Sequence, residues 1–295
     1  MTAKKGPAVM TPRNNMLAQH FVGQPLALCE QGARQLVASF TVPLASDNFP
    51  QMVAQSDDER PTDLYGNVIE RPELSSDGIM IIPIKGIVAR GLGRLGEICG
   101  YVDPDKIAVA VLEASENPSV RGIILKIDSP GGSVLGTGDA AESVSKAAKI
   151  KPLCVYAQGM MCSAAYWIGS HANTIYAGSS AYVGSIGVYV YIPDFSEYYG
   201  EMGIKYELIR SGKFKGSGSG LIPLSDDQRS DVQREIDMVG SDFRSFVSEV
   251  RTGISSEDME GQVYMGQASI DRGFVHSICN TFGEALAAFK NNINK

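Results

Sequence analysis

The chain has 295 residues, a formal net charge of −7 and a pI near 5.1. This length allows one large domain or two modest ones, and a composition of 44% hydrophobic and 20% charged residues is that of an ordinary globular protein. The acidic balance argues against a general nucleic-acid binder.

The five cysteines are widely spaced and form no Cys-x-x-Cys pair. This spacing indicates reduced thiols rather than a disulfide framework or a zinc site. Basic residues near the N-terminus have no apolar stretch behind them, and the sequence contains no uncharged run of about 18 apolar residues. We therefore expect no signal peptide, no membrane span and a cytoplasmic location.

The sequence pattern predicts that the N-terminal part of the chain lies outside a larger compact domain. Apolar residues at roughly helical spacing predict that residues 1–44 form a partly helical arm. Residues 45–77 contain three prolines and a charged cluster with little to bury, so we expect a polar linker. The compact domain then covers 78–295.

Strands and helices alternate in that domain. Short apolar runs predict buried strands over 79–84, 121–128 and 153–157, with a helix opening at Asp103-Pro104 and another over 138–149. Strands separated by helices of this length are typical of βαβ units and a largely parallel sheet, which places the chain in the α/β class. The alternation continues with a helix over 163–171, strands over 174–177, 182–190 and 205–210, and a helix over 194–202.

A long helix is expected from Ser225 to Arg251, opened by a capping box of Ser225 and Gln228. Its apolar residues recur at helical spacing and predict packing against the core or, alternatively, against another subunit. These residues are Val232, Ile236, Val239, Phe243, Phe246, Val247 and Val250. Short helices near 256–260, 267–273 and 282–290 complete the chain.

Two short segments are candidates for chemistry. The glycine pair Gly131-Gly132 follows a buried strand, so its backbone can turn with positive φ and offer N–H groups to an oxyanion, although a tight turn has the same pattern. Ser163 stands between an apolar run and an alanine-rich run, where a serine is either a nucleophile beside free N–H groups or a packing or cap residue. Cys162 is an alternative nucleophile, or a small buried thiol.

The general base is not an obvious histidine. His20 lies in the arm, His276 lies near the end, and His171 would be roughly 12 Å from Ser163 by helical rise. A Ser-His-Asp triad is therefore poorly supported. A neutral lysine can also activate a serine, provided that burial lowers its pKa well below the free value near 10.4.

A third segment supplies such lysines, in the loop Ser211-Gly-Lys-Phe-Lys-Gly216. Together and in this order, the three segments resemble the signal peptide peptidase A family of Ser-Lys proteases, and most closely its phage-type branch, the head-maturation (prohead) proteases. The resemblance covers roughly 78–280. Further segments that carry it are Ser-Ala-Ala-Tyr-Trp-Ile (163–168), Val-Gly-Ser-Ile-Gly-Val (183–188) and Gly-Gln-Val-Tyr-Met-Gly-Gln-Ala (261–268).

The resemblance implies a role for each matching residue. Ser163 is the nucleophile and Lys215 the general base; Lys215 fits better than Lys213 because the family's lysine follows an aromatic or similar residue. Ser185 orients the lysine. Gly132, with Gly131, and the N–H of Ala164 form the oxyanion hole.

The resemblance also implies a fold and partners. The fold is the Clp protease/crotonase-like spiral of βαβ units, here with an N-terminal helical arm. Family members form ring or dome homo-oligomers with active sites near subunit interfaces, so the lysine acts in cis or comes from a neighbour. No metal or cofactor is needed.

The implied function is that of a serine endopeptidase, processing phage capsid or scaffold proteins in the prohead or degrading peptides in the bacterial cytoplasm. Two alternatives stay open. One is a crotonase-type acyl-CoA enzyme, which uses the same fold and oxyanion hole. The other is a structural capsid or scaffold component with a vestigial protease site.

Overall fold

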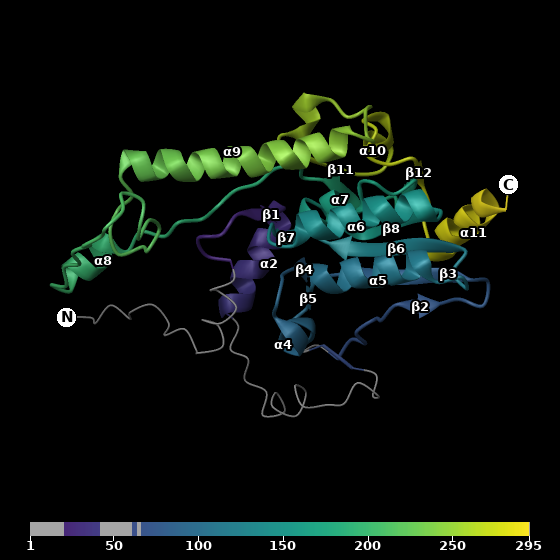
Figure 1. The fold of residues 1–295 in the computed structure, drawn as a ribbon, viewed down its shortest axis with the longest axis horizontal. Coiled ribbons are helices and arrows are strands. Elements are labelled where there is room, and N and C mark those ends of the chain that lie inside the picture. The colour runs from purple at the N-terminus through teal and green to yellow at the C-terminus, as the bar shows by residue number, and fades with distance from the viewer. Residues whose placement is uncertain (1–20, 42–60, 64–65, 295) are drawn as a thin grey trace.

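Parallel strands form the centre of the molecule in the computed structural model, which describes residues 21–41, 61–63 and 66–294 (Figure 1). The main sheet has the order β11-β10-β8-β6-β3-β2, with β9 on β8 and β12 on β9. All neighbours are parallel except β2–β3 and β10–β11. Its strands are β2 (Glu73–Leu74), β3 (Ile79–Lys85), β6 (Gly122–Ser129), β8 (Leu153–Cys162), β9 (Thr174–Ala177), β10 (Tyr182–Gly184), β11 (Val263–Tyr264) and β12 (Ser277–Ile278).

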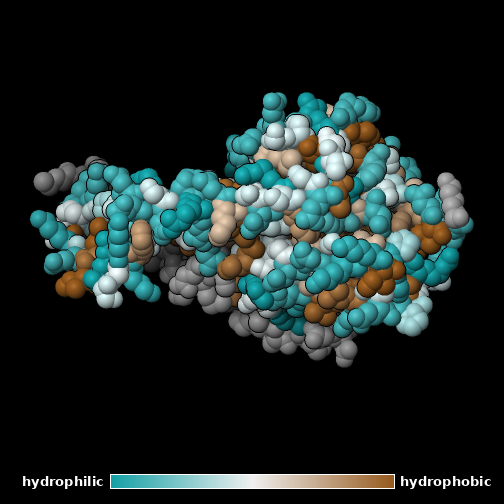
Figure 2. All heavy atoms as spheres, turned by 45° about the horizontal axis from the view of Figure 1, so that its top comes forward, coloured by the Kyte–Doolittle hydropathy of each residue, from teal (hydrophilic) through white to brown (hydrophobic). Residues whose placement is uncertain are grey.

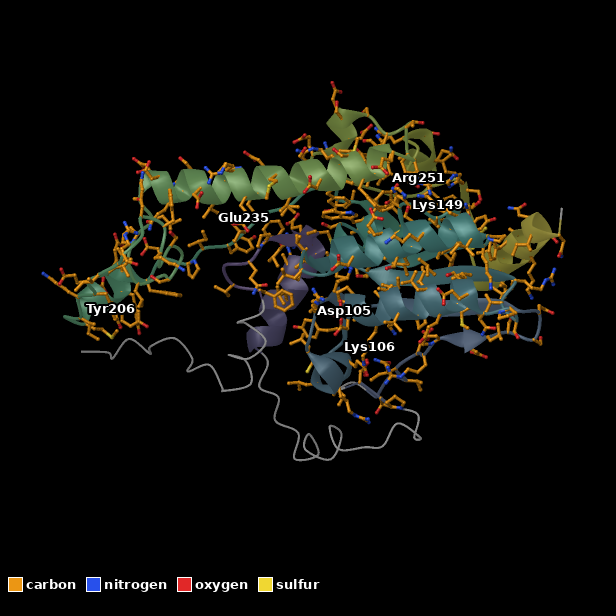
Figure 3. The ribbon with its side chains drawn as sticks, in the orientation of Figure 1. Asp105, Lys106, Lys149, Tyr206, Glu235 and Arg251 are labelled. Atoms are coloured by element: carbon orange, nitrogen blue, oxygen red, sulfur yellow. The ribbon has the colours of Figure 1, made fainter. Side chains whose placement is uncertain are left out.

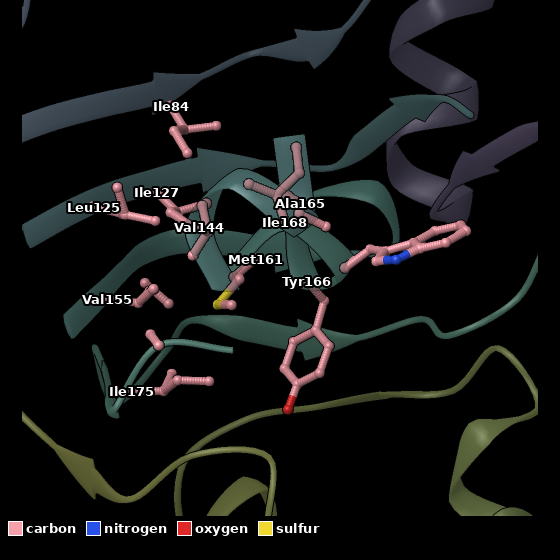
Figure 4. Packing of buried hydrophobic residues seen from close by; sticks show 14 of the residues in the cluster. Ile84, Leu125, Ile127, Val144, Val155, Met161, Ala165, Tyr166, Ile168 and Ile175 are labelled. Carbon is pink, nitrogen blue, oxygen red and sulfur yellow. The ribbon is translucent and has the colours of Figure 1, made fainter. Parts of the chain in front are cut away.

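Both faces of this sheet are covered, which explains why its strands read as continuous apolar runs. Successive side chains point to opposite faces. In β6, Ile123, Leu125 and Ile127 join the larger core beneath α5 (Pro104–Glu116), α6 (Thr137–Ile150) and α7 (Ala164–Gly169), part of which Figure 4 shows. Ile124 faces the opposite way, into a smaller core closed by α11 (Phe282–Ile293). The predicted α/β class and its βαβ units are confirmed.

A second sheet of four short strands lies beside the first, in the order β1-β7-β4-β5. It joins the glycine pair to the N-terminal segment, since β1 is antiparallel to β7 and β7 is parallel to β4. Part of the expected arm is described, and α2 within it is helical as predicted. The elements are β1 (Leu26–Leu28), α2 (Glu30–Thr41), β4 (Ile87–Val88), α4 (Gly93–Ile98), β5 (Tyr101–Val102) and β7 (Gly131–Ser133).

The remaining N-terminal predictions are only partly covered by the described residues. Residues 1–20 and 42–60, which include most of the expected arm and linker, lie outside them. Within the expected linker, β2 pairs with β3 of the main sheet. The division into arm, linker and domain stays a prediction.

Several boundaries differ from the sequence prediction. β8 runs on to Cys162, because β10 adds a parallel partner along its second half. The strand expected over 205–210 is wrong: these residues are exposed, and no strand among the described residues pairs with them. The strand expected over 182–190 ends at Gly184.

The long helix α9 (Asp226–Ser248) opens with the predicted capping box, in which Ser225 Oγ accepts from the Gln228 N–H and the Gln228 side chain accepts from the Ser225 N–H. Only its C-terminal half meets the core. Phe243 stacks on Trp167 with ring centroids 4.5 Å apart, and Val247 is buried. The predicted packing against the core therefore holds for half of the apolar stripe.

The N-terminal half of α9 extends away from the sheets and carries what we call the projecting lobe, residues 192–225 (Figure 1). This lobe contains α8 (Ser196–Glu201), and Figure 2 shows it projecting from the main body. The C-terminal region adds the 3-10 turn Ser256–Met259 and α10 (Gln267–Asp271). Among the described residues, no helix combines the length and apolar composition needed to cross a membrane.

Arg251 joins the end of α9 to the turn after α7. Its guanidinium is buried and donates to the carbonyls of Ser170 (2.7 Å) and Ala172, and it faces His276 Nε2 at 3.0 Å. We expect Arg251→Ala to lower the free energy of unfolding by about 3 kcal/mol, because it leaves two buried carbonyls without donors. Urea unfolding measures this effect. Arg234→Ala, which removes only an exposed ion pair with Asp231, is the control and costs less than about 1 kcal/mol.

His276 gives the fold a pH dependence. Burial, and then the charge of Arg251, lower the pKa of its imidazole below the ordinary value near 6.5. The unfolded chain therefore binds a proton at this residue more readily, so its contribution to stability is lost as the pH falls below about 6.5. We expect the stability difference between wild type and His276→Gln to shrink between pH 7.5 and 5.5 in urea titrations. A constant difference would contradict this.

Candidate active site

Ser163 occupies a sharp turn between the end of β8 and the first turn of α7. Its backbone has φ 55° and ψ −118°, a conformation that few residues other than glycine adopt. Two hydrogen bonds hold it: its N–H donates to Gly184 O at 2.7 Å, and its carbonyl accepts from Trp167 N at 2.9 Å. Strain of this kind costs about 1–3 kcal/mol and persists where the surrounding structure enforces it.

The hydroxyl of Ser163 is buried, with the residue only 1% exposed. Among the residues that the structure describes, its Oγ has no hydrogen-bond partner. Most buried hydroxyls are bonded, so an unbonded one is an exception that calls for an explanation. A side chain held this way is free to react or to take a partner from outside the described residues.

The glycine pair lies directly against this turn. A Cβ on Gly131 would lie 2.9 Å from Cys162 O, 3.0 Å from Ala164 N and 2.2 Å from Ala27 O, and the residue has φ 97°. Only glycine fits there. The structure thus brings Gly131 next to the residues on both sides of Ser163, as the sequence predicts.

The amides of this corner are not equivalent. The Gly131 N–H donates to Ser129 Oγ at 3.2 Å. Gly132 is packed on its other side against β4, where a Cβ would lie 2.0 Å from Val88 O. Ala164 is the first residue of α7, so its N–H has no partner within the helix. The Gly131 amide is thus engaged within its own loop, which leaves Ala164 and Gly132, the latter paired with Ala27 of β1, as the better placed donors for a developing negative charge.

Ser185 lies beside Ser163 on the neighbouring strand. β10 is parallel to β8 with Gly184 opposite Cys162, so the two serines follow their strands in the same register. Ser185 also has a positive φ of 54°, and its N–H donates to Gln262 O at 2.6 Å. It lines a cleft of about 660 Å³ together with Cys162. The serine predicted to orient the lysine is thus near the predicted nucleophile.

Lys215 is far from this cluster. It lies exposed in the projecting lobe, on the loop at the N-terminal end of α9, where Lys213 pairs with Asp227 at 2.6 Å. Because α9 contacts the core near Phe243, the helical rise from Asp227 alone is about 24 Å. Figure 3 shows Tyr206 of the same lobe well away from the sheets. Within one chain the structure does not bring Lys215 to Ser163.

The alternative catalytic residues have other contacts. His171 bonds to Ser145 Oγ (2.9 Å) and Phe246 O (2.7 Å), which is a structural role. Cys162 is fully buried, its thiol donates to Tyr182 O, and the hydrogen bond with Cys29 together with burial raises its pKa well above the usual value. A thiol kept protonated is a poor nucleophile. His20 lies outside the described residues.

One element near Ser163 is absent from the sequence prediction. β1 places Ala27 against Gly131, yet three apolar residues between Pro25 and Cys29 are too few to distinguish a strand from a loop. Across the described residues, no cluster of three or more His, Cys, Asp or Glu side chains is arranged to hold a metal ion.

Comparisons with known proteins identify relatives. The model of the family described as "Peptidase family S49" matches residues 145–294. The head-tail preconnector protein GP5 of Enterobacteria phage P21 is 28% identical over 276 residues, 90% of this chain and 53% of that protein. The capsid assembly protease C of Escherichia phage lambda is 32% identical over 208 residues, 70% of this chain and 47% of that protein. The chain thus spans about half the length of these curated relatives.

Among solved structures, a ClpP1 variant from Listeria monocytogenes is similar with a TM-score of 0.43 and 13% identity. The match covers 69% of this chain and 93% of that one.

Gly131→Ala tests how tightly this corner is packed. The added methyl group meets the Ala27 carbonyl and the backbone of Cys162, and the positive φ disfavours any side chain. We expect the free energy of unfolding to fall by about 2–4 kcal/mol, from steric overlap and backbone strain together. Gly138→Ala is the matched control, since a Cβ there meets nothing within 4 Å. Similar unfolding midpoints for the two variants would contradict this packing.

Proposed function

The chain belongs to peptidase family S49, and we propose that it is a serine endopeptidase that uses a dyad of Ser163 and Lys215. The observation that carries this proposal is the buried Ser163 hydroxyl, which has no hydrogen-bond partner in the described part of the chain and is held on a strained turn beside the N–H of Ala164. A nucleophile with oxyanion donors next to it is the arrangement that acyl transfer requires.

In the proposed reaction, Ser163 Oγ attacks the carbonyl carbon of an extended peptide. The amides of Gly132 and Ala164 stabilise the negative charge on the carbonyl oxygen. Lys215 takes the serine proton and returns it to the leaving amine, and water then hydrolyses the acyl-enzyme. A lysine accepts a proton only in its neutral form, and burial away from water favours that form.

We further propose that Lys215 is supplied by a second copy of the chain. Its distance from Ser163 within one chain supports this, as does the cleft beside Ser185, which is open to an incoming side chain. Ser185 Oγ would then orient the lysine. The projecting lobe also carries exposed apolar side chains that a partner would cover: Phe195, Tyr198, Met202, Ile204, Tyr206, Leu208, Ile209 and Phe214.

For substrates, we propose capsid or scaffold proteins of a phage, because the relatives include a capsid assembly protease and a head-tail preconnector protein. The enzyme would then act in the bacterial cytoplasm or inside the prohead. An extended substrate segment would bind by main-chain pairing with strands next to Ser163.

Cleavage of casein tests the dyad and the origin of its lysine together. We expect Ser163→Ala and Lys215→Ala each to lower the rate at least about 10³-fold, because each removes a member of one catalytic unit. An equimolar mixture of the two variants should regain activity, since a Lys215→Ala chain keeps its serine and a Ser163→Ala chain supplies the lysine. If the two variants associate at random, about a quarter of the sites combine an intact serine with an intact lysine, so about a quarter of wild-type activity is expected.

Lys213→Ala is the matched control, because Lys213 lies in the same loop but pairs with Asp227. It should keep activity close to wild type, and circular dichroism should show that every variant is folded. Activity that survives Ser163→Ala would refute the nucleophile. If size-exclusion chromatography shows that the two inactive variants assemble together and their mixture is still inactive, a site shared between two chains is refuted.

A further inference from the structure

The strand β1 lies between two other segments of the chain, next to Ser163. On one side it pairs antiparallel with β7, with Ala27 opposite Gly132 and Leu28 opposite Gly131. On the other side, Leu26 and Tyr189 exchange both backbone hydrogen bonds, at 2.8 and 3.0 Å. An extended peptide bonded along both edges is how a protease holds its substrate by main-chain pairing.

The register of β1 can be read from its hydrogen bonds. The Val134 N–H donates to Pro25 O at 3.2 Å, and the Cys29 N–H donates to Pro130 O at 2.9 Å. Bonded pairs alternate along an antiparallel ladder, so Ala27 and Gly132, midway between these two, form the bonded pair. The carbonyl of Ala27 therefore accepts from the Gly132 amide, one of the two donors proposed for the oxyanion.

The second proposed donor is close to the same carbonyl. Ala27 O lies 2.2 Å, and Ala164 N 3.0 Å, from the point where a Cβ of Gly131 would be. The carbonyl of Ala27 thus lies in the corner formed by the glycine pair and the first residue of α7. Of the residues in β1, Ala27 is the one whose carbonyl meets the candidate oxyanion hole.

The burial of the β1 side chains agrees with placing Ala27 at the candidate oxyanion hole. Ala27 is completely buried and belongs to the main core, whereas Leu26 and Leu28 join a separate cluster with Phe21. The space around the residue at the oxyanion hole therefore accepts a methyl group. Ser163 is itself only 1% exposed and β1 occupies both pairing edges beside it, so an external peptide that pairs with these edges would have to displace β1.

We propose that residues 25–29 are bound as an internal substrate and that the assembled protein cleaves its own Ala27–Leu28 peptide bond. This inference rests on the proposed protease function. It also assigns a specificity. The residue before the cut, Ala27, is small, and its two neighbours, Leu26 and Leu28, are apolar.

The proposed cleavage needs no reagent other than water. Ser163 Oγ bonds to the Ala27 carbonyl carbon, the bond from that carbon to the Leu28 nitrogen breaks, and the serine proton passes through Lys215 to the new Leu28 amine. Water then hydrolyses the Ala27–Ser163 ester. The products are residues 1–27 and 28–295, and loss of the first product opens the cleft to other peptides.

Cleavage would begin only on assembly, because a single chain keeps Lys215 away from its own Ser163. After the cut, Leu28 stays in its apolar cluster and Cys29 keeps its contact with the Cys162 thiol, a hydrogen bond that lowers the pKa of Cys29 to about 7. The new N-terminus at Leu28 would therefore keep its contacts, while release of residues 1–27 also requires Phe21 and Leu26 to leave the same cluster.

Intact-mass spectrometry of the full chain tests the proposal. Wild type, incubated at a concentration where it assembles, should lose residues 1–27 and show Leu28 as its new N-terminus, while Ser163→Ala should stay intact. In the mixture of Ser163→Ala and Lys215→Ala chains, only the Lys215→Ala chain should be cut, because only its site contains Ser163. Ala27→Gly should still be cut at this bond, and Ala27→Phe, if folded, at least tenfold more slowly.

The casein assay on the same samples separates the two proposals. A wild-type protein that degrades casein but leaves the Ala27–Leu28 bond intact would overturn the internal substrate and spare the protease function. A Ser163-dependent cut at another bond between residues 21 and 30 would overturn the register. A wild type that cleaves neither casein nor itself would overturn both.

Discussion

The backbone of Ser163 is the constraint on which the site depends. A parallel strand that ended in an ordinary turn would carry the serine past the glycine pair. Here φ 55° reverses the chain at once, and the bond from the Ser163 N–H to Gly184 O fixes that reversal against β10. Because β8 and β10 share a register, the same bond aligns Ser185 with Ser163. The strain is sustained by a fully covered sheet on one side and a buried helix on the other.

Glycine is needed at this corner for a related reason. Three backbone groups, from β1, β8 and α7, converge on Gly131: the carbonyls of Ala27 and Cys162 lie at distances that no Cβ tolerates, and the N–H of Ala164 lies at a distance that few tolerate. Removing a side chain at this one residue lets a peptide carbonyl, the nucleophile's own backbone and a helix N–H come together. The arrangement therefore depends on close backbone approach more than on any side-chain contact.

The long helix α9 keeps the two residues of the proposed dyad, Ser163 and Lys215, apart within one chain. Arg251 and Phe243 anchor its C-terminal half to the core, and its other half holds the loop with Lys215 away from Ser163. If a second copy completes the site, assembly and activity become one event. An internal strand over Ser163 would then be removed only where the protein has assembled, which restricts proteolysis in place and time.

The sequence alone determined the class of the fold and the chemistry of its residues. Apolar runs predicted β3, β6 and β8, the capping box predicted the start of α9, and the segments around Gly131, Ser163 and Lys215 pointed to the protease family. These features rest on patterns within short stretches of the chain, so they can be recognised without knowing what packs against them.

What the tertiary structure decided depends on partners far along the chain. The expected strand over 205–210 found no neighbour to bond with, and β8 grew longer because β10 paired with it. β1 is a strand only because β7 and Tyr189 lie on either side of it, since three residues carry no strand signal of their own. Likewise, the position of Lys215 follows from the length and anchoring of α9, so no spacing in the sequence could show that Lys215 and Ser163 lie apart.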